Sequence, residues 1–195
     1  LSRNFEMNKF NEYFYQQTQS MLTDLTTLVE IESPSRDKNA VDRVSRQVED
    51  WMQAAGAQVE IHPQRKTGDC VLGRWAGASG ADGKPITLLA HMDTVWPLGT
   101  LAERPVRVES GRLYGPGALD MKAGIVIALA ALRGLQVMNL VPAAPVNLLC
   151  TGDEEIGTHE SRALIRFLAS QSQLVLCLEP AIPGGALKTA RKGTG

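Results

Sequence analysis

The chain has 195 residues, enough for one well-buried α/β domain or for such a domain with a small appendage. Its 44% hydrophobic and 21% charged residues are ordinary for a globular protein, and its formal charge of −1 argues against a broad surface for nucleic acid or an anionic membrane. No apolar run reaches the roughly 18 to 20 residues that span a bilayer. The first residues, LSRNFEMNKF, also lack the apolar run of a secretory signal. We therefore expect neither nucleic acid nor a membrane as a partner.

Helical periodicity and strand-like apolar runs alternate along the chain. The first part predicts two helices and then two strands joined by a polar turn, at residues 8–31, 39–55, 58–62 and 70–75. The second part predicts strands at 86–90, 146–150 and 174–178, and helices at 121–138 and 158–170. Residues 77–85 and the Pro- and Gly-rich stretch that ends at 117 are predicted to be loops. This alternation favours an α/β fold with a doubly wound, mostly parallel sheet and helices on both faces.

The three cysteines, Cys70, Cys150 and Cys177, form an odd number without the paired spacing of a metal site. Two of them lie inside apolar strand-like runs, where a buried thiol behaves as a small hydrophobic side chain. We interpret them as structural residues. A reducing cytoplasm is the expected compartment, and a processed periplasmic protein is the alternative.

Four short segments end on residue types that bind metal ions. Three of them are apolar runs of strand length, followed by His91, by Glu154 and Glu155, and by Glu179. The fourth delivers Asp120 from a Gly/Pro turn just before a long apolar helix. In an open α/β sheet, ligands collect outside the carboxyl ends of the strands, so these side chains can converge on one crevice. One imidazole and several carboxylates would form an oxygen-rich site for one or two divalent metal ions.

Each of these residues also has a commoner structural explanation. A histidine at a strand end is more often hydrogen-bonded than metal-bound, and paired acids such as Glu154 and Glu155 usually lie in a solvated turn. Their joint placement at one edge of one sheet favours the metal site. The spacing of His91 and Asp93 supports it, because a carboxylate can hold the imidazole nitrogen that does not bind the metal. The other two histidines have no acids at such spacing, and we interpret them as surface or turn residues.

Two glycine-rich motifs are rejected as nucleotide sites. Residues 77–84 superficially resemble a phosphate loop, but the spacing is one residue too long and Pro85 replaces the hydroxyl residue that would hold magnesium. Residues 115–117 begin like a dinucleotide-binding fingerprint, but the sixth position is Asp120 rather than glycine.

Four blocks of this sequence resemble the signature blocks of the zinc-dependent exopeptidases and deacylases. That family includes aminoacylase, succinyl-diaminopimelate desuccinylase, peptidase T and the glutamate carboxypeptidases. The blocks occur in the family's order: HMDTV, GPGALDMKAG, TGDEEIGTHESR and LEP. The resemblance covers residues 8–193, and two stretches are most similar to the carboxypeptidase G type of glutamate carboxypeptidase, namely HMDTVWPLGTL and LKTARKGTG.

The resemblance implies a set of metal ligands. His91 and Glu179 would bind one zinc ion, and Asp120 would bridge it to a second zinc ion bound by Glu155. Co²⁺ or Mn²⁺ are alternatives to Zn²⁺. We expect the carboxylates of Asp120 and Glu179 within about 5 Å of His91, given zinc bonds of roughly 2.0–2.3 Å. In the family the bridging aspartate usually precedes a cis peptide bond, which here would join Asp120 and Met121.

The resemblance also implies a reaction. Glu154 would be the general base, and Asp93 would support His91. The expected activity is hydrolysis of an amide bond next to a free carboxylate, in a peptide with a C-terminal glutamate or in another N-acyl amino acid. The alternatives are a catalytically silent binding or scaffold relative with the same fold and a metal-dependent phosphoesterase. Retention of the acids and of His91 argues against the first, and the order of the blocks argues against the second.

The resemblance finally implies that residues 1–195 are the amino-terminal part of a metallopeptidase catalytic domain. The family's second zinc ion needs another histidine, supplied by sequence beyond residue 195. The lid and dimerisation domain and the distal catalytic half would be absent from this chain as well. We expect a homodimer through that lid. We also expect residues 1–195 alone to bind the second ion weakly and to hydrolyse little.

Overall fold

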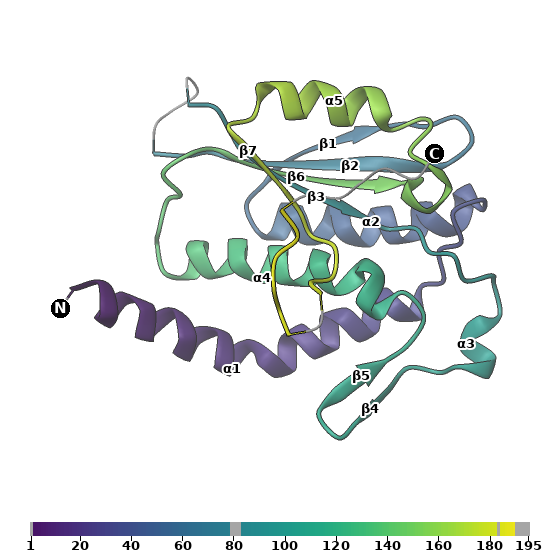
Figure 1. Ribbon diagram of the computed structural model, residues 1–195, viewed down its shortest axis with the longest axis horizontal. Coiled ribbons are helices and arrows are strands. Elements are labelled where there is room, and N and C mark those ends of the chain that lie inside the picture. Colours follow the sequence, from purple (N-terminus) through teal and green to yellow (C-terminus); the bar gives the residue numbers. More distant parts are fainter. Residues whose placement is uncertain (1, 79–82, 183, 190–195) are drawn as a thin grey trace.

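The computed structural model describes residues 2–78, 83–182 and 184–189. Its centre is a five-stranded sheet in the order β1-β2-β6-β3-β7 (Figure 1). β3 pairs in parallel with β6 and β7, whereas β2 pairs antiparallel with β1 and β6. The parallel arrangement expected from the sequence thus holds for β6, β3 and β7, and β1 and β2 extend it as an antiparallel part. The strand bounds are β1 (Gln58–His62), β2 (Gly68–Trp75), β3 (Ile86–His91), β6 (Val146–Gly152) and β7 (Leu174–Cys177).

Helices cover both faces of the sheet, as a doubly wound α/β fold requires (Figure 1). One face carries α1 (Ser2–Glu30), α2 (Lys38–Ala54) and α4 (Ala123–Val137), and the other carries α5 (Arg162–Gln171). The larger core cluster lies under the three helices, and a smaller cluster lies under α5. In α2 the apolar residues recur every three or four positions, so they all face the sheet. These buried residues are Val41, Val44, Val48 and Met52.

Local sequence explains where α2 begins and ends. The side chain of Asp37 accepts a hydrogen bond from the N–H of Ala40 at 3.0 Å, which satisfies one of the free N–H groups at the start of the helix. After the helix, Gly56 has a φ of 80°, a left-handed conformation that glycine adopts without steric strain. The helix therefore occupies nearly the range that the periodicity predicts.

The structure differs from the sequence-based expectation in the stretch up to residue 117, which is more than a loop. It contains the short helix α3 (Thr100–Glu103) and a hairpin of β4 (Arg107–Glu109) and β5 (Arg112–Tyr114) that projects away from the sheet (Figure 1). These two strands pair only with each other, and most of their side chains are exposed. No apolar run therefore marks them in the sequence.

Two helix starts also differ from the expectation. The helix expected from residue 121 is preceded by a separate irregular turn, η1 (Ala118–Lys122), and α4 follows it. The helix expected from residue 158 begins only at Arg162. The buried carboxylate of Asp153 accepts hydrogen bonds from the N–H groups of Glu160 at 2.8 Å and Ser161 at 3.2 Å, which keeps the preceding residues in a loop.

Some features that the sequence singles out lie partly outside the described residues. Residues 79–82 of the rejected phosphate-loop-like segment are among these, as are residues 190–195 of the closing motif. In the described part of the chain, no helix combines the length and the apolar character needed to cross a membrane.

Candidate metal centre

His91 ends β3, and its ring is almost completely buried. β3 lies between the parallel strands β6 and β7, so its carboxyl end is flanked by the carboxyl ends of these two strands. The ring nitrogen Nδ1 lies 3.0 Å from the backbone oxygen of Asp93 and 3.4 Å from its carboxylate. Both groups accept hydrogen bonds, so we assign the proton to Nδ1. Asp93 thus contacts the ring nitrogen that the sequence pattern suggests, although its backbone oxygen is the closer acceptor.

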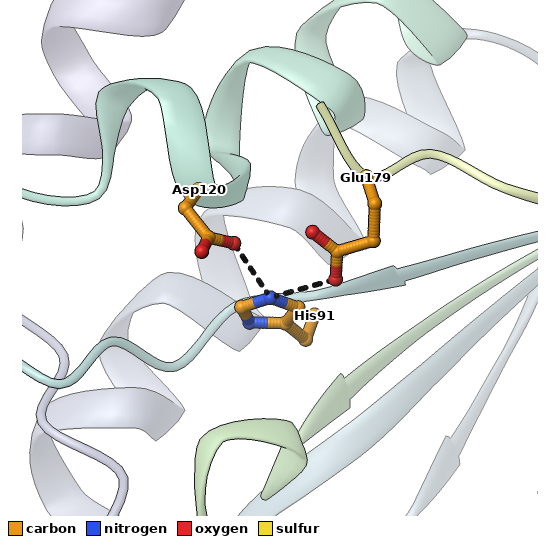
Figure 2. Close-up of side chains that lie close together, drawn as sticks. All are labelled: His91, Asp120 and Glu179. Atoms are coloured by element: carbon orange, nitrogen blue, oxygen red, sulfur yellow. Dashed lines mark ion pairs between the residues drawn. The ribbon is translucent and has the colours of Figure 1, made fainter. Parts of the chain in front are cut away.

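The other ring nitrogen, Nε2, faces three carboxylates. It lies 3.3 Å from Asp120 Oδ1, 3.3 Å from Glu179 Oε1 and 3.9 Å from Glu154 Oε2. Figure 2 shows the carboxylates of Asp120 and Glu179 pointing at His91 from two different segments of the chain. His91, Asp120 and Glu179 each offer one possible ligand atom, and these three atoms all lie within 4.8 Å of one another. The expected proximity of Asp120 and Glu179 to His91 is therefore confirmed.

Asp120 reaches the site from η1, where the peptide bond between Asp120 and Met121 is cis, as the family resemblance implies. The next residue, Lys122, anchors this turn. Its buried ammonium group donates hydrogen bonds to the carbonyl oxygens of Leu28 at 2.9 Å and Ile31 at 2.8 Å, at the end of α1. The turn that carries Asp120 is thus tied to a helix far away in the sequence.

Glu154 and Glu155 lie in the short helix η2 (Glu154–Ile156), directly after β6. The buried carboxylate of Asp93 accepts a hydrogen bond from the N–H of Glu154 and another from the N–H of Glu155, each at 3.2 Å. Among the described residues, the tight group of possible ligand atoms around His91 includes neither glutamate. The structure therefore places both beside the group, with their backbone fixed by Asp93.

Crowded charges shift the pKa values of this site. Burial opposes protonation of His91, but hydrogen bonds and charges of neighbouring carboxylates outweigh it and raise its pKa to about 11. Hydrogen bonding to His91 lowers the pKa of Glu179. Burial, followed by the charge of Glu179, raises the pKa of Asp120. Burial also raises the pKa values of Glu154 and Glu155, and the surrounding acids add to this shift. Several carboxylates around one imidazole leave an excess of negative charge, which a metal ion would offset.

A divalent cation fits the residues of this site. Nε2 of His91 is buried, and its contacts with Asp120 and Glu179 at 3.3 Å do not meet hydrogen-bond geometry, although buried polar atoms in proteins nearly always form a hydrogen bond. An imidazole nitrogen without a proton is a metal ligand. Together with Asp120 and Glu179 it offers one nitrogen and two carboxylates, a donor set that zinc accepts in catalytic sites with three protein ligands.

Residues 87–190 match the family described as Peptidase family M20/M25/M40. This match covers more than half of the chain and contains every residue of the candidate site. The chain belongs to peptidase family M20/M25/M40. The resemblance inferred from four sequence blocks is thereby confirmed. The M20 family is metal-dependent, which agrees with the donor set around His91.

Two relatives illustrate the similarity within the M20 family. The chain is 32% identical over 167 residues to carboxypeptidase G2 of Pseudomonas sp. (strain RS-16), which covers 85% of this chain and 40% of that protein. It is 31% identical over 170 residues to succinyl-diaminopimelate desuccinylase of Rhodospirillum centenum, which covers 81% of this chain and 43% of that protein. The chain therefore spans about two fifths of the length of these relatives.

Solved structures with lower sequence identity share the fold. Human carnosine dipeptidase 1 matches with a TM-score of 0.75 and 19% identity, over 87% of this chain and 40% of that chain. An M20 family metallo-carboxypeptidase from Sulfolobus solfataricus matches with a TM-score of 0.68 and 20% identity, over 85% and 38% of the two chains. The expected α/β architecture is thus that of known M20 structures.

Two residues that shape the site do not stand out in the sequence motifs. Lys122 anchors the turn of Asp120, and the signal for it is a lysine at the start of an otherwise apolar helix. Asp153 fixes the loop after η2, and the signal for it is a third acid next to Glu154 and Glu155. Both are almost fully buried, which a motif of charged residues does not reveal.

Proposed function

We propose that this chain carries the metal centre of a hydrolase that cleaves an amide bond next to a free carboxylate. The proposed substrates are peptides with a C-terminal glutamate and other N-acyl amino acids. The observation that carries the proposal is the buried Nε2 of His91, which faces the carboxylates of Asp120 and Glu179 with Glu154 beside them. Membership of the M20 family and similarity to a carboxypeptidase and a desuccinylase support it.

In this proposal His91, Asp120 and Glu179 hold one zinc ion, and Asp120 and Glu155 contribute to a second. Co²⁺ and Mn²⁺ are alternatives with the same ligands. Bound ions of this kind polarise a scissile carbonyl group and lower the pKa of water. The remaining ligand of the second ion would be a histidine outside these 195 residues, since the chain spans 40% of the length of carboxypeptidase G2. Residues 1–195 alone would then hydrolyse little.

Glu154 is the proposed general base. Its carboxylate is half-exposed and lies 3.9 Å from Nε2 of His91, so it can reach a water molecule at the site without being needed as a ligand. Burial raises its pKa, which brings the group closer to the neutral range where a general base works best. It would take a proton from water and pass it to the leaving amine. Asp93 is a positioning residue, because it holds both His91 and the backbone of Glu154.

We further propose that the complete protein has a lid and forms a homodimer through it in a reducing compartment. The chain matches only 40% of carboxypeptidase G2, so a complete protein of similar length has room for such a lid. Two buried cysteines without a disulfide, Cys70 and Cys150, agree with the compartment.

The test is the variant Glu154→Gln in the complete, zinc-loaded protein, assayed on N-benzoyl-glutamate. We expect kcat to fall by about 10²–10⁴-fold, the usual contribution of a general base. The zinc content should not change, because Glu154 is not a proposed ligand. Glu12→Gln, an exposed residue on α1, is the matched control and should keep wild-type turnover.

Two results would contradict the proposal. Near-normal turnover by Glu154→Gln would remove this residue from the role of base. A wild-type protein that binds zinc but hydrolyses no N-acyl amino acid would disprove the proposed reaction.

A further inference from the structure

A cavity lined by three arginines adjoins the turn that carries Asp120. It has a volume of about 530 Å³ and lies between the segment after β3, the β4–β5 hairpin and the residues that lead into η1. Arg104, Arg107 and Arg112 line it, and among its described lining residues there is no acid. The rest of the lining is mainly apolar or aromatic. A cationic cavity of this kind stands in contrast to the acidic group around His91.

Aromatic rings hold two of these arginines in place. The guanidinium carbon of Arg104 lies 4.5 Å from the centre of the Trp96 ring, and that of Arg107 lies 4.4 Å from the centre of the Tyr114 ring. Such stacking occupies the face of a guanidinium group and leaves the N–H groups in its plane available as donors. The two arginines are therefore oriented before any ligand binds.

Only one of the three arginines has an ion pair among the described residues. Arg107 has a single ion pair, with Glu109 at 3.5 Å, and both side chains are more than half exposed to solvent. Within the described residues, neither Arg104 nor Arg112 forms an ion pair. Exposed ion pairs contribute little free energy, so the one pair present does not neutralise the cavity. An anion is therefore its complementary ligand.

The cavity is close to the metal centre along the chain. Ala118 and Leu119 line it, and Asp120 is the next residue. Leu119 is therefore about 3.8 Å from Asp120 between Cα atoms.

We propose that this cavity binds a carboxylate of the substrate that is attached to an apolar body. This inference rests on the proposed function and deepens it, because it names a second recognition site on the substrate. Arginine donors match the two oxygens of a carboxylate, and Leu113, Leu119 and Pro116 offer apolar contacts for the rest of the group. The volume lies within the range of roughly 300–1,000 Å³ typical of small-molecule pockets.

The test is the binding of glutarate to the metal-free complete protein, measured by calorimetry, with glutaramide as the neutral probe. Metal-free protein is used because a bound ion would itself attract carboxylates. We expect the double variant Arg104→Gln/Arg112→Gln to raise the Kd of glutarate about tenfold or more, since hydrogen bonds to charged groups are lost. Binding of glutaramide should not change. Arg166→Gln, an exposed arginine on α5, is the matched control and should bind like the wild type.

The single variant Arg112→Gln guards against misfolding, because this exposed side chain has no ion pair in the described structure to lose. This single substitution should by itself weaken the binding of glutarate. Undetectable binding by the wild type at millimolar glutarate would overturn the proposal. Equal Kd values for wild type and double variant would overturn it too, as would the same loss in Arg166→Gln.

The outcome is independent of the proposed reaction. A protein that binds glutarate through these arginines but hydrolyses no N-acyl amino acid retains the anion site and disproves the reaction. A protein that hydrolyses an acidic substrate with the same KM in wild type and double variant retains the reaction and disproves the anion site.

Discussion

The metal centre has a buried part and an exposed part that are built differently. The side chains of His91 and Asp93 are 1% and 0% exposed, whereas those of Asp120 and Glu154 are 59% and 47% exposed. The sheet and its hydrogen bonds hold the buried part before any ion binds. The exposed part consists of like charges in water that an ion would draw together. Fold stability should therefore depend mainly on the buried part, whereas ion affinity should depend on both parts, and mutation should show this difference.

The largest effect is expected for Asp93→Ala in the buried part. The variant removes the acceptor for the N–H groups of Glu154 and Glu155 and a carboxylate beside His91. We expect the free energy of unfolding to fall by about 3 kcal/mol, as for other buried charged partners. Zinc affinity should fall about 100-fold, because a residue that orients a ligand is lost. Urea unfolding of the metal-free protein and a competition titration with a zinc chelator measure the two quantities.

Asp50→Ala, on the exposed face of α2, is the control for Asp93→Ala. It should leave both quantities unchanged. An unaltered urea midpoint in Asp93→Ala would show that the buried part does not hold the fold.

Glu179→Gln changes a carboxylate whose side chain is 29% exposed, and it should lower zinc affinity with a smaller loss of stability than Asp93→Ala. It removes one carboxylate from the group that faces Nε2 of His91, so zinc affinity should fall by roughly tenfold or more. The free energy of unfolding of the metal-free protein should fall by about 1 kcal/mol, because the contact with His91 is lost but no charge is left fully buried without a partner. The same titration and urea unfolding apply. A loss of stability like that of Asp93→Ala would erase the distinction between the two parts.

The last prediction requires no mutation and concerns the release of a single proton. In the ion-free site the pKa of His91 is raised to about 11, so the ring carries an extra proton at pH 7. Zinc needs the neutral nitrogen, so its binding should release about one proton from His91, and affinity should rise by up to tenfold per pH unit towards that pKa. Calorimetry at pH 7 in two buffers with different ionisation enthalpies measures the release. Absence of release would mean that the ring is already neutral.

Much of the site could be predicted because the chemistry follows the strands. His91 and Glu179 come at or just after the ends of β3 and β7, two neighbouring parallel strands whose carboxyl ends share one edge. Apolar runs mark both strands in the sequence, so the positions of these two side chains at the strand ends could be predicted from the pattern of apolar residues. The proximity of Asp120 came from the family resemblance as well, since a turn alone does not fix where its side chain points.

Other features depend on contacts between distant segments, which a pattern along the chain does not record. The antiparallel pairing of β2 with β6 joins two apolar runs, and each would look the same in a parallel sheet. The hairpin of β4 and β5 has too few buried residues to give a period. The role of Lys122 depends on two carbonyl groups at the end of α1.

The position of Asp93 has a consequence for thermal motion at the site. Its side chain is bound to the backbone of Glu154, and its carboxylate and backbone oxygens lie beside the ring of His91. Two groups tied to the same side chain are displaced together when that side chain moves. Their separation therefore fluctuates less than the position of either one. The distance between the proposed metal ligand His91 and the backbone of the proposed base Glu154 is thus set by one shared residue and not by two independent loops.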